Sequence, residues 1–241
     1  MPKRDITITT SEGACPAGLF MPQGGSAIGV ILYMDAFGLR PALDAMASRL
    51  EGEGHAVLVP DLFYRSGAYG PFDAKTAFAV EESATRIRAM MGATTQAMTQ
   101  ADTAAFLDTL ASEGVESVGV VGYCMGGARA LNAAAAHPGR IKAAASFHGG
   151  NLASEAEDSP HRNAASIRAR VYVGVAGVDR SFPPEQSARL AQALREAEVD
   201  HAIENYVGKA HGWCVPDHSA HDEVGAECHW KRLLTLFDES L

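Results

Sequence analysis

The sequence predicts an α/β protein with a mostly parallel central sheet of about eight strands and helices on both faces. Strand-like apolar runs alternate with segments of helical periodicity over most of the 241 residues, which is typical of parallel strands connected by helices. Residues 27–34 and 116–124 are continuously apolar, as expected for strands buried on both faces. No repeat, low-complexity segment or linker divides the chain, so we expect one domain over residues 1–241.

The first quarter of the chain predicts a hairpin and two buried strands. A turn at Ser11–Gly13 connects the two strands of the hairpin, and a glycine ends the helix that follows the first buried strand. In order, we expect strands over 5–10, 15–22 and 27–34, a helix over 40–54, and a strand over 55–63.

The rest of the chain continues the alternation. Residues 71–112 predict the longest helical stretch, as two helices separated near Gly92. The long connection over residues 64–101 is the expected lid or excursion, because it exceeds the usual length of a connection. The remaining expected elements are strands over 116–124, 141–149 and 169–177, a helix that begins at a proline pair over 183–199, a strand over 200–207, and an amphipathic helix over 219–238.

Composition and charge exclude several classes of function. The formal charge of −9 and the absence of a basic, aromatic-interleaved stretch argue against nucleic-acid and anionic-membrane partners. The N-terminus has no apolar core of a secretory signal, and no apolar run reaches the roughly 20 residues of a spanning helix. We therefore expect a cytoplasmic protein. The four cysteines form no CxxC pair, so we expect reduced thiols and no metal or other cofactor. No motif indicates the oligomeric state.

The segment VGVVGYCMGGARA, residues 118–130, carries the strongest functional signal. A buried strand, a Gly-x-Cys-x-Gly-Gly turn and an alanine-rich helix follow one another here, which is the context of a nucleophile elbow. This turn exposes Cys124 at a helix N-terminus, where the helix dipole favours a thiolate. The N–H group of Met125 would supply half of an oxyanion hole. The alternative is a buried cysteine in an ordinary βα turn.

Two later residues complete a candidate triad in the order nucleophile, acid, histidine. Asp179 follows the strand predicted over 169–177, and His211 follows the strand predicted over 200–207. Taken alone, the aspartate could cap a turn and the histidine could belong to an ordinary loop. Together with Cys124 they stand where such a fold brings catalytic residues together.

The sequence resembles the dienelactone hydrolase family of the α/β-hydrolase fold. GYCMGGARA resembles the elbow of the family and HGW its histidine motif, while YMDAFGL and VLVPDLFYRSG resemble the segments after the third and fourth strands. The resemblance extends over residues 28–213 and implies that Cys124 is the nucleophile, His211 the base and Asp179 its orienting acid. It also implies that the Ala36 N–H is the second oxyanion donor.

Two positions differ from the family pattern. Asp35 stands where the family usually has a glutamate that contacts the resting thiol, so Asp35 is a candidate for activating the nucleophile. Val215 stands where the dienelactone enzymes carry an arginine that clamps the substrate carboxylate, and valine cannot make such bonds. Arg86 or Arg88 could compensate in part. We therefore expect a preference for neutral or apolar substrates. The candidate pocket walls are Phe37, Tyr123, His148 and Trp213.

The expected activity is hydrolysis of a small-molecule ester or lactone through a thioester intermediate, and the expected promiscuous substrates are activated aryl or phosphate esters. A thiol redox protein that pairs Cys124 with Cys214 is the main alternative. Metal-dependent hydrolysis is a second alternative, with candidate ligands His211, His218, His221, Asp217 and Asp222. A non-catalytic binding module is the third.

Overall fold

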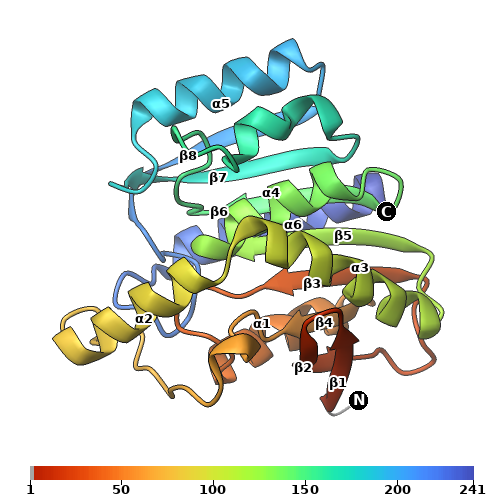
Figure 1. Ribbon diagram of the computed structural model, residues 1–241. Coiled ribbons are helices and arrows are strands. Elements are labelled where there is room, and N and C mark those ends of the chain that lie inside the picture. The colour runs from red at the N-terminus through yellow and green to blue at the C-terminus, as the bar shows by residue number, and fades with distance from the viewer. Residues whose placement is uncertain (1–2) are drawn as a thin grey trace.

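The computed structural model describes residues 3–241, and one sheet with the strand order β1-β2-β4-β3-β5-β6-β7-β8 forms its centre (Figure 1). β2 pairs antiparallel with both β1 and β4, whereas the pairs from β4 through β3 to β8 are all parallel. The expected hairpin and mostly parallel sheet are therefore confirmed. The strands are β1 (Arg4–Thr10), β2 (Gly13–Phe20), β3 (Ile28–Tyr33), β4 (Ala56–Pro60), β5 (Ser117–Tyr123), β6 (Ile141–Phe147), β7 (Arg170–Val178) and β8 (His201–Ala210).

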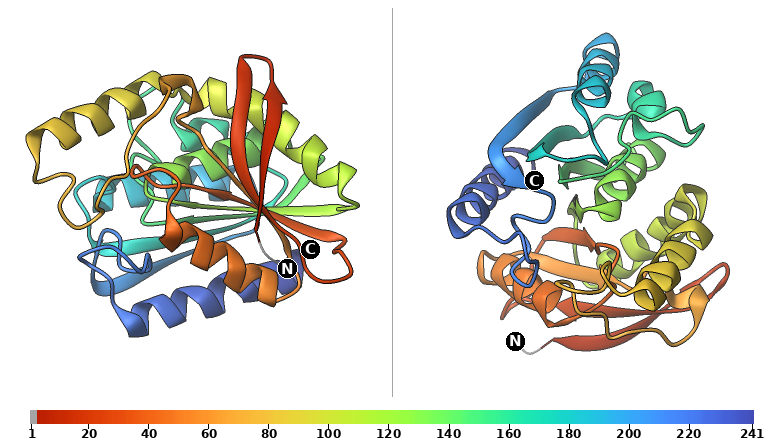
Figure 2. Two further views of the ribbon diagram at one scale, coloured as in Figure 1. Left: turned by 90° about the horizontal axis from the view of Figure 1, so that it is seen from below. Right: turned by 90° about the vertical axis from the view of Figure 1, so that its left-hand side faces the viewer.

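Helices cover both faces of the sheet, as the sequence predicts. α1 and α6 pack on one face, and α3, α4 and α5 lie on the other (Figure 2). The helices are α1 (Pro41–Gly52), α2 (Glu81–Ala93), α3 (Gln96–Ser112), α4 (Met125–Ala136), α5 (Pro184–Glu196) and α6 (Glu223–Ser240), with short 3-10 helices η1 (Tyr64–Ser66) and η2 (Pro160–Ser166).

Local signals explain where several helices begin. α1 and α5 each begin at a proline, a residue suited to the first helical turn because its missing N–H would have no partner there. α6 begins at Glu223 rather than at residue 219, because the Asp222 side chain accepts a hydrogen bond from the Gly225 N–H at 2.8 Å. That carboxylate cap fixes the start of the helix.

The long helical stretch predicted over residues 71–112 is shorter in the structure. Residues 71–80 are not helical, and turns span residues 74–79, where the Asp73 side chain accepts from the Lys75 N–H and from the Thr76 hydroxyl. The break between the two helices lies at residues 94–95, near Gly92 as expected. There the Thr95 hydroxyl caps α3 by accepting from the Met98 N–H at 3.2 Å.

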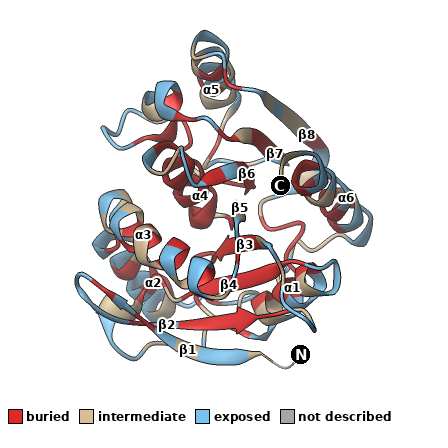
Figure 3. Ribbon diagram, turned by 90° about the vertical axis from the view of Figure 1, so that its right-hand side faces the viewer, coloured by how far each residue is buried: buried red, intermediate tan, exposed pale blue. Residues whose placement is uncertain are grey.

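The central strands form the core, as their continuous apolar pattern predicts. β3, β4 and β5 are buried along nearly their whole length, whereas the edge strand β1 is largely exposed (Figure 3). All residues of α4 from Met125 to Ala135 are buried, and the small alanine side chains let this helix lie close to the sheet. Within residues 3–241 no helix combines the length and the apolar character needed to cross a membrane.

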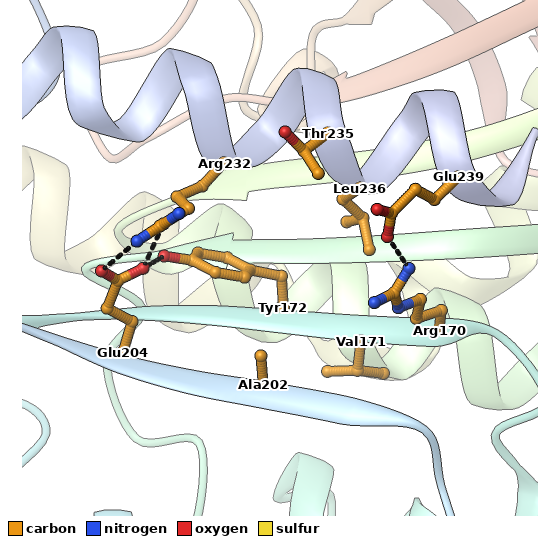
Figure 4. Close-up of a pocket in the computed structure, with 9 residues that line it drawn as sticks. All are labelled: Arg170, Val171, Tyr172, Ala202, Glu204, Arg232, Thr235, Leu236 and Glu239. Atoms are coloured by element: carbon orange, nitrogen blue, oxygen red, sulfur yellow. Dashed lines mark hydrogen bonds and ion pairs between the residues drawn. The ribbon is translucent and has the colours of Figure 1, made fainter.

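Paired charges hold α6 against strands β7 and β8 around a small cavity of about 320 Å³ (Figure 4). Arg232 on the helix donates to both oxygens of Glu204 at 2.7 and 3.0 Å, and the Tyr172 hydroxyl donates to the same carboxylate. Arg170 pairs with Glu239 at the other end of the cavity. These charged groups are therefore matched within the chain, between α6 and the strands that it covers.

Candidate active site

Cys124 lies in the turn between β5 and α4, with backbone angles φ 55° and ψ −119°. This positive φ is rare for a residue with a side chain, and such strain often marks a functional site. The turn also needs glycine on both sides. A Cβ on Gly122 would overlap the Gly126 carbonyl, and a Cβ on Gly126 would overlap the carbonyl oxygens of Tyr33 and Met34 on β3. The Gly-x-Cys-x-Gly spacing therefore has a steric cause.

The backbone of Cys124 is fixed from the end of the neighbouring strand β6. Its N–H lies 3.2 Å from the Phe147 carbonyl oxygen and 3.1 Å from Nδ1 of the buried His148. Because Nδ1 accepts a hydrogen bond, the neutral ring carries its proton on Nε2. Burial holds the pKa of His148 well below its ordinary value, which keeps the imidazole neutral. The neutral His148 ring therefore holds the backbone of the turn at Cys124 by accepting a hydrogen bond from its N–H.

His211 and Asp179 meet at the carboxyl ends of β8 and β7. His211 Nδ1 lies 2.7 Å from Asp179 Oδ2. The other oxygen, Oδ1, accepts from the Ser181 N–H at 2.8 Å and from the Ser181 hydroxyl at 2.6 Å. Burial would raise the pKa of Asp179, but the hydrogen bonds from His211 and Ser181 lower it below its ordinary value. The carboxylate is therefore charged and oriented toward the imidazole.

The imidazole of His211 interacts with Cys124 as well as with Asp179. Burial lowers the pKa of His211, but the charge of Cys124 and the hydrogen bond with Asp179 outweigh burial and raise it to about 10. The ring thus lies between a carboxylate and a sulfur atom. Such an arrangement can move a proton between the thiol and a substrate.

The loop after β3, which contains Ala36, is held by a buried charge network. The Asp35 carboxylate is fully buried and receives both Arg40 Nη atoms at 2.6 and 2.8 Å. It also accepts from the Phe37 N–H and contacts His218 Nε2 at 3.3 Å. Burial would raise the pKa of Asp35, but His218 and Arg40 hold it below its ordinary value. In residues 3–241, the contacts found for the Asp35 carboxylate are with Arg40, Phe37 and His218. None of them is with the Cys124 thiol.

The HGW motif has a structural role beyond its histidine. Gly212 has a φ of 92°, and a Cβ there would overlap the His218 ring. Trp213 is fully buried and packs on Tyr206, with ring centroids 4.5 Å apart. The glycine and the tryptophan therefore fix the loop that presents His211 next to Asp179.

A pocket of about 1100 Å³ opens above the nucleophile turn. Cys124, Met125 and His211 line it, together with Pro160 of η2 and residues of the loop before η2. The segment 64–101, expected from its length to be a lid or excursion, contributes Phe78, Arg88, Met91 and Gln96. The remaining lining residues are Ala128, Arg129, Gly150, Asn151, Ser154, Ala156, Asp158, Ser159, Pro160, Val178, Asp179, Arg180 and Ser181.

The four residues expected as pocket walls do not line this pocket. Tyr123 is fully buried, and its hydroxyl lies 2.9 Å from His229 Nε2. Trp213 and His148 are buried beneath the site, and Phe37 packs edge-on against Phe78. Each of these aromatic rings supports a loop of the site and does not face the pocket.

Sequence analysis identified some of the charged residues that line the pocket and missed others. Val215 is fully buried and does not line the pocket, so an arginine clamp at this position has no counterpart here. Arg88 does line the pocket, whereas the exposed Arg86 donates to the Ala68 carbonyl instead. Sequence reasoning missed Asp158, Arg180 and, on α4, Arg129. The one signal for Arg129 is a charged side chain inside the apolar helix GGARALNAAAA.

The candidate metal ligands are engaged in other contacts. His218 contacts Asp35, Asp217 pairs with Arg40 at 2.6 Å, and Asp222 caps α6 and pairs with Lys209 at 2.7 Å. In the described part of the chain, no three or more His, Cys, Asp or Glu side chains are grouped so that they could hold a metal ion.

Comparisons with known proteins agree with this fold. Residues 16–241 match the profile of the dienelactone hydrolase family. A carboxymethylenebutenolidase from Rhodococcus opacus is 28% identical over 233 residues, which cover 90% of this chain and 83% of that protein. The crystal structure of a dienelactone hydrolase-like promiscuous phosphotriesterase from metagenomic libraries matches with a TM-score of 0.80 and 26% identity, covering 99% and 98% of the two chains.

A candidate dienelactone hydrolase from Klebsiella pneumoniae has a similar fold. Its crystal structure matches with a TM-score of 0.86 and 23% identity, over 98% of both chains. The family profile spans the whole chain after residue 15, and the eight-stranded sheet agrees with these neighbours. The chain therefore belongs to the dienelactone hydrolase family and is a hydrolase with an α/β-hydrolase fold.

Proposed function

We propose that the protein hydrolyses carboxylic esters or lactones with Cys124 as the nucleophile, His211 as the base and Asp179 as the acid that orients it. The observation that carries this proposal is the position of the His211 imidazole. Its Nδ1 is hydrogen-bonded to Asp179 at 2.7 Å, and the charge of Cys124 raises its pKa. A histidine with only a structural role in a loop would not need to interact with both Asp179 and Cys124.

The reaction proceeds in two acyl-transfer steps. The Cys124 thiolate attacks the carbonyl carbon, and the resulting oxyanion accepts hydrogen bonds from the N–H groups of Met125 and Ala36. The bond to the leaving oxygen then breaks, and His211 gives that oxygen a proton, which leaves a thioester on Cys124. Water activated by His211 attacks the thioester. The carboxylic acid leaves, and the sulfur is free again.

Asp35 has a positioning role in this proposal. Its buried carboxylate holds the Phe37 N–H at 3.0 Å and accepts two bonds from Arg40. This network fixes the loop that carries the Ala36 N–H, and a preorganised oxyanion donor is worth ~3 kcal/mol in hydrolases. We therefore infer that Asp35 orients the second oxyanion donor, rather than activating the thiol as expected from the family pattern.

The names of the relatives suggest two substrate classes. One relative is a carboxymethylenebutenolidase, and a structural neighbour is a promiscuous phosphotriesterase. We propose esters or lactones as the principal substrates, because the oxyanion donors and the nucleophile turn suit a planar carbonyl. Activated phosphate esters are a secondary class, since a thiolate with a neighbouring imidazole also displaces good leaving groups.

Hydrolysis of 4-nitrophenyl acetate tests the proposal. Turnover by the wild type that is lost in Cys124→Ala, with a chelator present in both assays, supports a cysteine nucleophile. Cys228→Ala provides a matched control, because Cys228 is a free thiol on α6, outside the pocket. Equal rates in the wild type and Cys124→Ala would refute the proposal.

A thiol redox function with Cys214 as the resolving thiol is the main alternative. Cys214 is buried, and burial raises the pKa of its thiol well above the ordinary value, which disfavours the thiolate that disulfide exchange requires. All four cysteines are free thiols. Under our proposal Cys214→Ser keeps ester hydrolysis. Formation of a Cys124–Cys214 disulfide on peroxide treatment of the wild type, with no hydrolysis, would favour the redox function.

A further inference from the structure

His148, directly after β6, contacts both the nucleophile and the base of the candidate triad. Its Nδ1 accepts from the Cys124 N–H at 3.1 Å, and its ring packs edge-on against the His211 ring, with the two centroids 4.7 Å apart. Cys124 follows β5 and His211 follows β8, and these two strands are not neighbours in the sheet. One side chain therefore joins the two groups that exchange a proton in the proposed reaction.

The hydrogen bond with Cys124 is the only one that the His148 ring makes within residues 3–241. The other ring nitrogen, Nε2, is buried and has no partner there. The Cys124 N–H shares its hydrogen bond between Nδ1 and the Phe147 carbonyl oxygen, which lies at 3.2 Å. A phenylalanine at position 148 would fill a similar space but could not accept this bond. A histidine is thus suited to holding the nucleophile turn.

The ring of His148 is packed tightly enough to restrain its neighbours. It is 1% exposed, and its centroid lies 5.4 Å from that of Trp213 and 6.0 Å from that of Tyr123. The His211 side chain, by contrast, is 29% exposed. An aromatic pair in edge-on contact is worth about 0.5–1.5 kcal/mol beyond the area that it buries. The fixed ring of His148 therefore limits how far the more accessible His211 ring can turn.

The backbone of His148 is held in an unusual conformation. Its φ is 39°, and the φ of Cys124 is also positive at 55°. Such values cost free energy in residues with a side chain and persist only where the surrounding structure fixes them. The His148 N–H donates to the Gly174 carbonyl oxygen on β7 at 2.9 Å, which helps to fix this conformation. Two strained residues are thus joined directly by the Nδ1 hydrogen bond.

A neutral His148 ring is compatible with a charged His211. Burial, together with the charges of three other histidines, holds the pKa of His148 well below its ordinary value. The pKa of His211 is raised to about 10, so that ring is a cation at neutral pH and a second cation beside it would repel it. The titratable groups that face His148 are Cys124 and Tyr123 near the end of β5, His211 and His218 in the loop after β8, and His229 on α6.

We propose that His148 is a positioning residue of the hydrolase, which fixes the Cys124 turn through Nδ1 and the His211 imidazole through the packing of its ring. This role presupposes the triad of the proposed function. His148 does not line the pocket, so it acts through Cys124 and His211 and not on the substrate. A misplacement of about 1 Å in a catalytic geometry can cost about 10²-fold in rate, which is why a contact that holds both partners matters.

Two variants separate the two contacts of His148. His148→Asn keeps an acceptor, because its Oδ1 is as many bonds from Cα as Nδ1 is, and it removes the ring. We expect kcat for 4-nitrophenyl acetate to fall about 10- to 100-fold. The pKa of His211, measured by NMR titration, should fall below the wild-type value of about 10, because a ring that is free to turn pairs less well with Cys124.

The second variant, His148→Phe, keeps a ring and removes the acceptor. The Cys124 N–H then retains the Phe147 carbonyl oxygen as its partner. We expect kcat to fall by up to about tenfold, the equivalent of one hydrogen bond, with KM and the pKa of His211 little changed.

His55→Asn is the matched control for the loss of a buried imidazole. His55 is 4% exposed and packs edge-on against Phe237, with centroids 5.8 Å apart. It lies just before β4, at the opposite end of the parallel strands from Cys124. We expect His55→Asn to lower Tm, because the cavity it leaves destabilises the fold. The kcat of the folded enzyme and the pKa of His211 should stay at their wild-type values.

The outcomes distinguish positioning from a role in stability. A lower Tm in His148→Asn with an unchanged pKa of His211 overturns the inference, and so does wild-type kcat in both folded variants. If His148→Asn does not fold, His148→Phe decides: a lower kcat at an unchanged KM supports the inference, and wild-type kcat overturns it. If the wild type hydrolyses no ester, the proposed function fails. The NMR titration of His211 in wild type and His148→Asn then still tests the positioning role, since it needs no substrate: a lower pKa in the variant supports it, and equal values overturn it.

Discussion

Replacing Asp179 by asparagine tests how the His211 imidazole is held. In the wild type, Asp179 Oδ2 lies 2.7 Å from His211 Nδ1, while Oδ1 accepts from the Ser181 N–H at 2.8 Å. The Ser181 N–H can only donate, so an asparagine keeps its oxygen on that side. Its NH₂ group then faces His211 Nδ1. That nitrogen must become an acceptor, and the proton of the ring moves to Nε2.

An imidazole with its proton on Nε2 cannot take a proton from Cys124. General-base catalysis contributes about 10²- to 10⁴-fold to a rate, so we expect kcat for 4-nitrophenyl acetate to fall by this factor in Asp179→Asn. KM should change little, because the Asp179 carboxylate is already engaged by His211 and Ser181. Initial rates over a range of substrate concentrations, with thermal unfolding of each preparation, measure both quantities.

Ser181→Ala is the matched control. It removes the hydroxyl that donates to Asp179 Oδ1 at 2.6 Å and keeps the carboxylate and the backbone N–H. The lost hydrogen bond is worth about 1 kcal/mol, so we expect kcat to fall by less than about tenfold. A folded Asp179→Asn variant with the same kcat as Ser181→Ala would refute the reasoning about the tautomer.

Three other predictions follow from charge and packing. NMR titration of His211 should give a pKa of about 10 in wild type and a lower pKa in Cys124→Ala, because the charge of Cys124 helps to raise it. Since this pKa is raised on folding, the contribution of His211 to stability is complete below pH 6.5 and is lost as the pH rises through about 10. Arg40→Met should lower the free energy of unfolding by about 3–5 kcal/mol, because a buried carboxylate loses its partner, whereas Arg49→Met in an exposed pair should cost less than about 1 kcal/mol in urea unfolding. Gly126→Ala should destabilise the fold by at least about 1–3 kcal/mol through overpacking, measured as a lower Tm.

Each of these predictions has an outcome that contradicts it. The first is wrong if His211 titrates at the same pH with and without Cys124. Equal losses of stability in Arg40→Met and Arg49→Met would show that the buried network does not hold its loop. Gly139→Ala is the control for the glycine, because a Cβ there has open space within 4 Å. A Gly126→Ala variant as stable as Gly139→Ala would refute the steric account of the turn.

Most of the fold could be predicted from the sequence, because the central strands are short apolar runs with no competing pattern. β3 and β5 lie within the expected ranges, and their burial agrees with their composition. The α2–α3 boundary could be predicted only approximately. Glycine inside a helix costs only about 1 kcal/mol, so Gly92 does not break α2, whereas the hydroxyl cap of Thr95 starts α3. The cost of a glycine inside a helix and the gain from a hydroxyl cap are both about 1 kcal/mol. The sequence alone therefore does not show which of the two sets a helix boundary.

The candidate site could be proposed from the sequence where a local motif marks it, but not where residues distant in the sequence come together. The turn around Cys124 has a local steric pattern, and Asp179 and His211 each follow a strand. By contrast, the contact of Asp35 with His218 spans 183 residues of sequence, and no motif connects the two. Arg129 was missed because the alanine-rich helix gives no indication that one of its faces lines a pocket.

The central claim is that Cys124 carries the acyl group during turnover. We would quench the wild type during hydrolysis of 4-nitrophenyl acetate at low pH and analyse the peptides by mass spectrometry. We expect one acetyl group on the peptide that contains Cys124. This group should disappear when the quench is delayed until the substrate is used up, and it should be absent in Cys124→Ala. Steady turnover with no acetyl group on Cys124 and undiminished activity in Cys124→Ala would contradict the claim.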